Sequence, residues 1–248
     1  FFSPYIYPSQ KMKQLIPPFF KRNLNRFKRG MTDFVDFKND RFAKSTITNE
    51  KLNFSLEKTQ DVKPSETLES KVNNLKLGAK KIQSIIIYPQ EIFSFWKSVG
   101  VPNLRNGFSK SRTIIDGKLS PSTGGGLCQL SGIIYHASLE AGLAIVERHH
   151  HSVDIYENES DRYAPLGSDA TVVYGYKDLR IRNNLESPIK FEFDVQNHQI
   201  TIYIKSTFEI SKQSIKFVIN NQSAEKITVS THIGNNIICQ SNYQKPST

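Results

Sequence analysis

The stretch that decides how this chain folds is GGGLCQLSGIIYHASLEAGLAIVERHHHS, which runs from Gly124 to Ser152. A helix is predicted to open after the three glycines and to reach about Gly142, because apolar residues recur there at helical spacing: Leu130, Ile133, Ile134, Ala137 and Ala141. Gly142 suits the position just beyond a helix end, where the backbone turns left-handed. Apolar residues then recur at every second position, which predicts a strand from Ala144 to His151. We therefore expect the chain to reverse direction at Gly142.

A second firm helix and a series of strands are predicted on either side of this stretch. The helix follows Pro64, with Ser65 as its N-cap and Pro89 as its stop, and its apolar face is Leu68, Val72, Leu75, Ala79, Ile82 and Ile86. A weaker helix is expected over residues 24–37. Period-two patterns predict a hairpin turn at Asn197-His198 and strands at residues 144–151, 170–176, 179–183, 189–195, 200–206, 216–219 and 226–230. Helices followed by strands predict an α+β fold, with N-terminal helices packed on a mainly antiparallel β-sheet.

The distribution of charge suggests how the chain is divided. Its 248 residues carry 33 Lys and Arg against 23 Asp and Glu, a net charge of +10, and residues 1–45 alone hold ten Lys or Arg and three Asp. We predict a basic, partly irregular N-terminal arm over residues 1–60, a folded domain over residues 61–208, and C-terminal strands with a loose tail over residues 209–248. The arm suits an anionic polymer or an acidic membrane surface, or it is a solvated tail without a partner. No nucleic-acid-binding motif is present, so nucleic acid is not an expected partner.

The composition excludes several classes of protein. Hydrophobic residues make up 38% and aromatic residues 11% of the chain, which is enough for a sizeable core and too much for a disordered chain. No apolar run approaches the roughly 18 residues of a membrane-spanning helix. The aromatic opening of the chain is interrupted by prolines, unlike a signal peptide, so we assign neither a cytoplasmic nor a cell-envelope location. The two cysteines, Cys128 and Cys239, exclude a disulfide scaffold.

The glycine loop and the cysteine that follows it are the sharpest candidate for chemistry. Gly124, Gly125 and Gly126 directly precede a helix, so their amide N–H groups, together with Gln129, are candidates to bind a negative charge. Cys128 falls in the first helical turn, where the helix dipole lowers the pKa of a thiol. This arrangement predicts a nucleophile beside an oxyanion hole. The alternative is a flexible turn followed by a buried, inert cysteine.

A run of histidines returns to the level of this cysteine. The predicted helix rises about 20 Å, and the strand after Gly142 travels back about 17–24 Å. Alternation along the strand places His149 and His151 on one face, within reach of Cys128. A Cys–His pair is the minimum for thiol acyl transfer. Asp169, at the start of a predicted strand, is a candidate to orient a histidine, or else a turn carboxylate.

Two other interpretations of the histidines remain open. They are polar residues at the end of a strand, or they bind zinc with Cys128 as a third ligand. Because the chain has neither a CxxC nor an HExxH motif, we expect no metal and no other cofactor.

Four blocks of the sequence, in this order, resemble the VanW family, named for an accessory protein of vancomycin-resistance clusters. The resemblance covers roughly residues 70–195, and the blocks read FSFWKSVG (93–100), GGGLCQLS (124–131), AGLAIVERHHHSVDI (141–155) and APLGSDATVVYGYKDLRIRNN (164–184). The resemblance implies a setting of bacterial cell walls and glycopeptide resistance, and makes the predicted domain at 61–208 a VanW-like domain. Some proteins with a VanW domain are described as L,D-transpeptidases that use the motif cysteine. The matching residues here are Cys128, His149 and His151, with Arg148 ahead of them as a further binding residue.

Two functions are therefore expected as alternatives. In the first, a thiol acyltransferase or amide hydrolase acts on peptidoglycan stem peptides. Cys128 attacks a carbonyl, His149 or His151 moves the proton, the amides of residues 125–128 hold the oxyanion, and Asp169 orients the histidine. In the second, a non-catalytic module binds peptidoglycan or a muramyl-peptide precursor, with the glycine loop as its anion site.

Overall fold

The computed structural model describes residues 24, 25, 27–31, 33, 35, 41–115, 118–156 and 158–245, without the side chains of residues 112–121. The chain divides into two units, Phe1–Asn39 and Asp40–Thr248. In the first unit the described residues are helical, as predicted for residues 24–37; the rest of that prediction, like the last three residues of the predicted loose tail, lies outside the described residues. Everything below concerns the second unit. No helix among the described residues is both long enough and apolar enough to cross a membrane.

The helices of the second unit include α2 (Leu68–Ile82), α3 (Phe95–Val99) and α4 (Leu127–Glu140), with short 3₁₀ turns at Leu104–Asn106 and Glu159–Asp161. In α2 the buried side is the predicted apolar face, from Val72 to Ile82. In α4 all 14 residues except Cys128 are buried. A helix that is buried on every side belongs to the centre of a core. Cys128 is therefore the most exposed residue of this helix.

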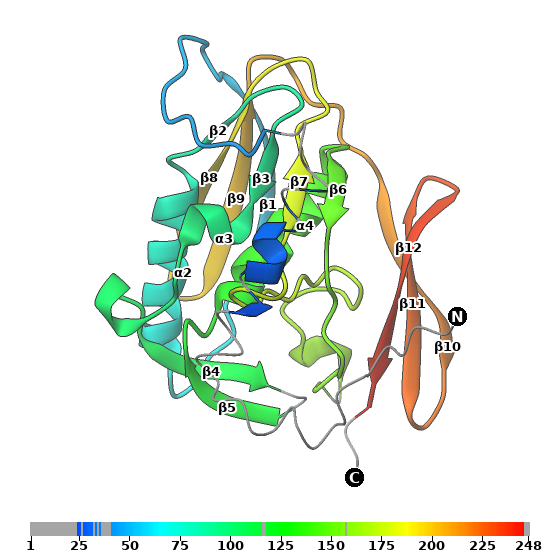
Figure 1. The fold of residues 1–248 in the computed structure, drawn as a ribbon. Coiled ribbons are helices and arrows are strands. Elements are labelled where there is room, and N and C mark those ends of the chain that lie inside the picture. Colours follow the sequence, from blue (N-terminus) through cyan, green and yellow to red (C-terminus); the bar gives the residue numbers. More distant parts are fainter. Residues whose placement is uncertain are drawn as a thin grey trace, which may run out of the picture. The chain divides into compact units, whose positions relative to one another are not determined.

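The strands form four sheets in which every pairing between named strands is antiparallel (Figure 1). The four-stranded sheet has the order β1-β9-β8-β2, formed by Phe54–Asp61, Gln199–Ser206, Ile189–Val195 and Ile86–Ile87. A three-stranded sheet has the order β3-β7-β6, formed by Ile92–Ser94, Arg180–Arg182 and Ala144–Glu147. A second three-stranded sheet has the order β10-β11-β12, formed by Ile215–Gln222, Lys226–Ile233 and Asn236–Gln244. A hairpin joins β4 (Lys110–Ile115) to β5 (Lys118–Thr123).

Packing of helices on the four-stranded sheet creates the main core. Helix α2 packs on β8, and α4 packs on β1 and β9. The apolar faces of these elements enclose side chains with almost no exposed surface, among them Leu75, Leu130, Ile133, Phe191 and Ile202. The α+β prediction is thus confirmed, since helices cover antiparallel sheets.

The predicted reversal at Gly142 is present and has a specific geometry. Gly142 adopts a φ of +69°. Its N–H donates to Leu139 O at 3.0 Å, and the N–H of Leu143 donates to Ser138 O at 2.9 Å. These two bonds are the pair that closes a helix in a Schellman motif. The chain then leaves α4 directly into β6.

Other strands match their predictions closely. β8 has the predicted bounds, and β9, β10 and β11 contain the predicted segments. The hairpin turn at Asn197-His198 is confirmed by the pairing of Val195 with Ile200.

Several predicted element bounds are wrong. The cap of α2 is Thr67 rather than Ser65, and its helix ends at Ile82, so that Ile86 belongs to β2. Residues 170–176 form no strand; the one ladder contact there is an isolated bridge from Val173 to Lys177. β6 ends at Glu147, four residues before His151.

Six strands were not predicted: β1, β2, β3, β4, β5 and β12. β1 pairs along its whole length with β9, although only Leu56 and Gln60 among its side chains are buried, so its period-two signal is weak. β12 occupies most of the predicted loose tail after His232 and pairs with β11. Upstream of β1, the backbone at Arg41 and Ala43 exchanges hydrogen bonds with Ile92 of β3, and Ser45 forms a bridge with Ile86 of β2. The predicted domain boundaries stay a prediction.

Candidate functional site

The glycine loop sets the start of α4 and so the position of the cysteine. Gly124 and Gly126 have φ values of +89° and +100°, which side chains rarely adopt, and Gly126 is the N-cap residue of α4. The buried Asn74 of α2 holds the loop, because its amide nitrogen donates to Gly125 O at 2.9 Å and to Ser109 O at 3.0 Å. The loop therefore delivers Cys128 into the first turn of the helix.

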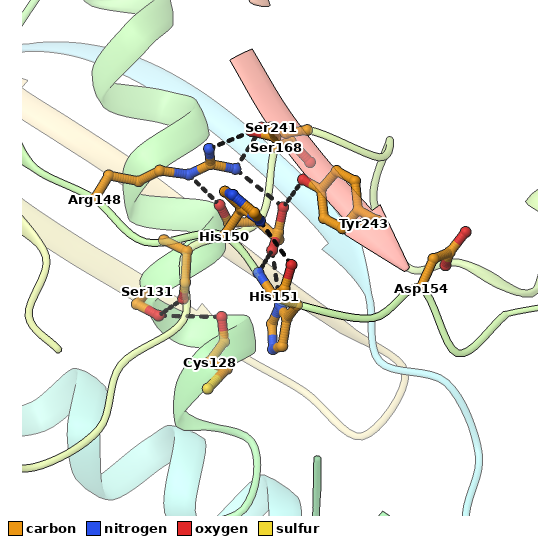
Figure 2. Close-up of polar contacts among 12 residues, drawn as sticks. Cys128, Ser131, Arg148, His150, His151, Asp154, Ser168, Ser241 and Tyr243 are labelled. Carbon is orange, nitrogen blue, oxygen red and sulfur yellow. Dashed lines mark hydrogen bonds and ion pairs between the residues drawn. The ribbon is translucent and has the colours of Figure 1, made fainter. Parts of the chain in front are cut away.

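Cys128 is half-buried and lies beside His151 (Figure 2). Its Sγ lies 3.8 Å from Val172 O. Burial by itself raises the pKa of the thiol, but the hydrogen bond and positive charge of His151 outweigh burial and lower the pKa below its ordinary value. The thiol is thus placed to exist as a thiolate.

His151 is held by Asp169. Its Nδ1 lies 2.7 Å from Asp169 Oδ2, and its backbone N–H donates to the same oxygen at 2.7 Å. Burial lowers the pKa of His151, but the bonds to Asp169 and Cys128 raise it to about 10. Because Nδ1 is used by Asp169, Nε2 is the ring nitrogen left for the thiol. The three side chains form a thiol–imidazole–carboxylate chain, an arrangement that can activate a nucleophile.

Asp169 is in turn anchored by Arg148 and Tyr243. Arg148 donates through Nε to Asp169 O at 2.8 Å and through Nη2 to Asp169 Oδ1 at 3.0 Å. The hydroxyl of Tyr243 in β12 donates to the same Oδ1. Burial alone raises the pKa of Asp169, yet the bond and charge of His151 and the charge of Arg148 hold it well below its usual range. The carboxylate therefore stays ionised and fixed.

Arg148 has a different place from the one predicted. It was expected to bind an anionic ligand, but its guanidinium is buried, with 7% of the side chain exposed, and it stacks 4.9 Å from the ring centroid of Tyr135. Its remaining bonds go to Ser241 Oγ at 2.6 Å and Gly167 O at 2.9 Å. The structure makes Arg148 a positioning residue for Asp169.

His149 is not brought to the cysteine. Its Nε2 lies 2.9 Å from Glu147 Oε1, and 38% of its side chain is exposed. The predicted alternation fails because β6 ends at Glu147, so no pleat continues to His151. The structure therefore selects His151 alone from the predicted pair.

A cleft of about 230 Å³ opens beside the cysteine. Its lining includes Cys128, His151, Gly124, Gly126, Gln129 and Lys71. Gln129 donates through Nε2 to Asp61 O at 2.7 Å, whereas its buried Oε1 has no hydrogen-bond partner among the residues that the structure describes. A smaller cavity of about 50 Å³ is lined by His151, Tyr243 and residues of 153–156 and 162–166. The predicted loop residues thus line a space that can admit a ligand.

Within the described ranges of the chain, no group of three or more His, Cys, Asp or Glu side chains is placed to hold a metal ion. His149 and His151 have separate carboxylate partners, Glu147 and Asp169. The geometry therefore suits proton transfer at a thiol rather than the zinc site that the histidine spacing left open.

Three residues of the site escaped the sequence analysis. Asn74 supports the glycine loop from 51 residues away, and Ser241 and Tyr243 support Arg148 and Asp169 from 93 and 74 residues away. The alternation of β12, in which Ser241 and Tyr243 are the buried positions, is the only signal that pointed to them.

Comparison with known proteins agrees with the sequence blocks. The chain is 38% identical over 121 residues to the uncharacterized protein YoaR of Bacillus subtilis, covering 49% of this chain and 38% of that relative. It is 32% identical over 157 residues to the vancomycin B-type resistance protein VanW of Enterococcus faecalis, covering 60% of this chain and 56% of that relative. No solved structure matches the chain. A family model described as VanW like protein matches residues 70–205, which is more than half of the sequence, and so the chain belongs to the VanW family.

Proposed function

We propose that this protein is a cysteine-dependent acyltransferase, or an amide hydrolase of the same chemistry, that acts on peptidoglycan stem peptides in a setting of glycopeptide resistance. The observation that carries the proposal is the chain of contacts from Cys128 through His151 to Asp169 at the edge of an open cleft. The similarity to a vancomycin B-type resistance protein supports the setting.

In the first step the Cys128 thiolate attacks the carbonyl carbon of a stem-peptide amide and forms a C–S bond. The oxygen becomes negative and is received by the N–H of Cys128, which lies in the first turn of α4, where helices leave N–H groups unused. The next N–H groups, of Gln129 and Leu130, already donate to Gly126 O. His151 gives its Nε2 proton to the leaving nitrogen, the C–N bond breaks, and a thioester remains on Cys128.

In the second step an amine or a water attacks the thioester. His151, now neutral, takes a proton from the attacking group, and the C–S bond breaks to restore the thiolate and the imidazolium. An amine acceptor gives a new cross-link, and water gives hydrolysis. Asp169 stays ionised throughout and keeps Nε2 directed at the thiol through its bond to Nδ1.

The ionisation of the thiol tests the physical basis of this mechanism. In a Cys239→Ser background, alkylation of Cys128 by iodoacetamide should show a midpoint below the ordinary pKa of about 8.5 for cysteine. His151→Gln should raise that midpoint above the ordinary value, because burial then acts without the opposing imidazolium. His149→Gln is the matched control, and it should leave the midpoint unchanged since His149 contacts Glu147. An equal shift in both histidine variants would contradict the assignment.

Turnover tests the reaction itself. Wild-type protein incubated with tetrapeptide-stem substrates should release product and carry an acyl adduct on Cys128 that mass spectrometry detects. Cys128→Ser and His151→Gln should each abolish turnover, and the double variant should be no worse than either, because members of one catalytic unit are strongly non-additive. Absence of both turnover and adduct with several stem peptides would favour the non-catalytic binding module instead.

A further inference from the structure

Lys71 of α2 faces the same cleft as the reactive thiol. It lines the cleft together with Cys128 and His151. It also lies against the glycine loop, since a Cβ built on Gly126 would stand 3.0 Å from Lys71 Cγ. Its ammonium is 5.9 Å from the ring centroid of Tyr163, another residue of the cleft. The side chain is thus half-buried, next to the nucleophile.

This lysine has no acidic partner in the part of the chain that the structure describes, and no Asp or Glu is among the residues lining the cleft. Burial lowers its pKa to about 8, so most of it still carries a proton at neutral pH. A half-buried cation without an anion is costly unless a ligand supplies the opposite charge. Lys63, which also lines the cleft, differs because its ammonium lies 3.5 Å from Asp61 Oδ2 and donates to Ser160 O.

We propose that Lys71 forms a carboxylate-binding subsite, so that the molecule that reaches Cys128 carries a carboxylate which pairs with the Lys71 ammonium. A single ammonium matches the single negative charge of a carboxylate, and the hydroxyl of Ser65, another residue of the cleft, suits its second oxygen. That the carboxylate belongs to a substrate rests on the proposed acyl-transfer function. That Lys71 binds a carboxylate rests on the residues of the cleft alone.

Two alkylating reagents of similar size test the subsite without any turnover. Iodoacetate carries a carboxylate and iodoacetamide does not. Because both react with the same thiolate, the fraction of Cys128 that is ionised cancels in the ratio of their rate constants. In the Cys239→Ser background, Lys71→Met should lower the iodoacetate-to-iodoacetamide ratio about fivefold or more, the effect of losing one nearby charge. Lys71→Arg should retain the ratio, and Lys63→Met is the matched control that should leave it almost unchanged.

The pH dependence of this ratio identifies the responsible group. The ratio should fall as the pH rises through about 8 in wild type, where Lys71 loses its proton, and the fall should be absent in Lys71→Met. The other titratable groups that line the cleft are Cys128, His151, Lys63, Tyr156 and Tyr163. His151 titrates near 10 and burial raises the pKa of Tyr163 well above its ordinary value, so these two keep their charge state in that window, while the ionisation of Cys128 cancels in the ratio. Thermal unfolding of each variant checks that it is folded.

Stem peptides then distinguish the source of the carboxylate. A peptide with a C-terminal amide and a peptide with a neutral side chain at its third residue are each compared with the parent tetrapeptide. If one of these two peptides lacks the carboxylate that Lys71 binds, its KM with wild-type protein should be higher than that of the parent tetrapeptide. In Lys71→Met the two KM values should not differ in this way. An unchanged alkylation ratio in Lys71→Met, or an equal fall in Lys63→Met, would overturn the subsite. Failure of every stem peptide to react, with the ratio behaving as expected, would instead overturn the proposed reaction and leave the subsite in place.

Discussion

Asp169 is the residue on which the charges of the site converge. Its two carboxylate oxygens accept hydrogen bonds from His151, Arg148 and Tyr243, and only 14% of its side chain is exposed. A carboxylate in such a setting is a structural element as well as a part of the chemistry, since removal of one member of a buried ion pair leaves the others uncompensated.

Asp169→Asn should therefore reduce the free energy of unfolding by about 3–5 kcal/mol at pH 7. The folded pKa of Asp169 lies below its ordinary value of 3.8, so its stabilisation is fully present above pH 3.8 and is lost as the pH falls from there toward the lowered folded pKa. Urea unfolding of wild type and variant from pH 2 to 7 should show the two curves converging in acid. Asp194→Asn, at an exposed position, is the control that should change little. A gap as large at pH 2 as at pH 7 would show that charge is not the cause.

At the scale of elements, the end of α4 determines where the histidine loop begins. Gly142 closes the helix with a φ of +69°, and a Cβ there would meet only Gln213 Cγ at 3.7 Å, so space does not restrict the position. Gly142→Ala should reduce the free energy of unfolding by about 1–2 kcal/mol, because a left-handed backbone penalises any Cβ. Gly142→Asn should lose less, since asparagine tolerates this conformation. Chemical denaturation of both variants checks the order, and equal losses would point to the side-chain volume instead.

β12 is a second element that reaches into the site. Gln244 exchanges backbone hydrogen bonds with Ser152 and Asp154 at 2.8 and 2.9 Å, so β12 runs along the loop that follows His151. Tyr243, beside it, donates to Asp169. The sheet β10-β11-β12 lies beyond the family match at residues 70–205 and still supplies part of the support of the triad.

Tyr243→Phe should keep the buried ring and lose only the hydroxyl. We expect a loss of about 1–2 kcal/mol in the free energy of unfolding, because one oxygen of a buried carboxylate loses a donor. The variant should also lower the rate of acyl transfer without changing KM, since Tyr243 does not line the cleft beside Cys128. Tyr203→Phe, in the half-exposed part of β9, is the control in equilibrium unfolding and kinetic assays. A rise in KM with an unaltered rate constant would be inconsistent with a positioning role.

At the scale of the whole molecule, the second compact unit extends from Asp40, upstream of β1. The backbone of Ala43 donates to Ile92 O at 2.9 Å, and the ring of Phe42 lies 4.3 Å from the ammonium of Lys97 and 5.1 Å from the guanidinium of Arg180. Because the folded domain is predicted to begin at residue 61, deletion of residues 1–45 would be expected to spare it. These contacts change that expectation.

Deletion of residues 1–39 should leave the midpoint of thermal unfolding within a degree or two, because the second compact unit begins at Asp40. Deletion of residues 1–45 should lower it by several degrees, through loss of the pairing with β2 and β3. Differential scanning calorimetry of the two truncated proteins measures the difference. The shorter deletion should also weaken binding to anionic polymers and flatten its salt dependence, since it removes most of the basic excess of residues 1–45. Equal midpoints for both deletions would show that Phe42 and Ala43 do not contribute to the fold.

The sequence by itself determined the elements whose cause is local. Apolar spacing along residues 127–140 predicted α4, and the glycine at 142 predicted its end. Alternation along residues 189–206 predicted the β8–β9 hairpin. Each of these signals lies within the segment that it describes. The same local signals located Cys128 at a helix start and placed histidines within reach of it.

Only the tertiary structure decided which residues complete the site. His151 rather than His149 meets the thiol because β6 stops at Glu147, whose carboxylate takes His149 and the N–H of Asp178 from a neighbouring strand region. Asn74 contacts Gly125, 51 positions away in the sequence, and Tyr243 contacts Asp169, 74 positions away. β1 pairs with β9 although most side chains of β1 are exposed. A burial pattern reports that a side chain is covered, but the partner that covers it is set by contacts between segments distant in sequence, which no local period encodes.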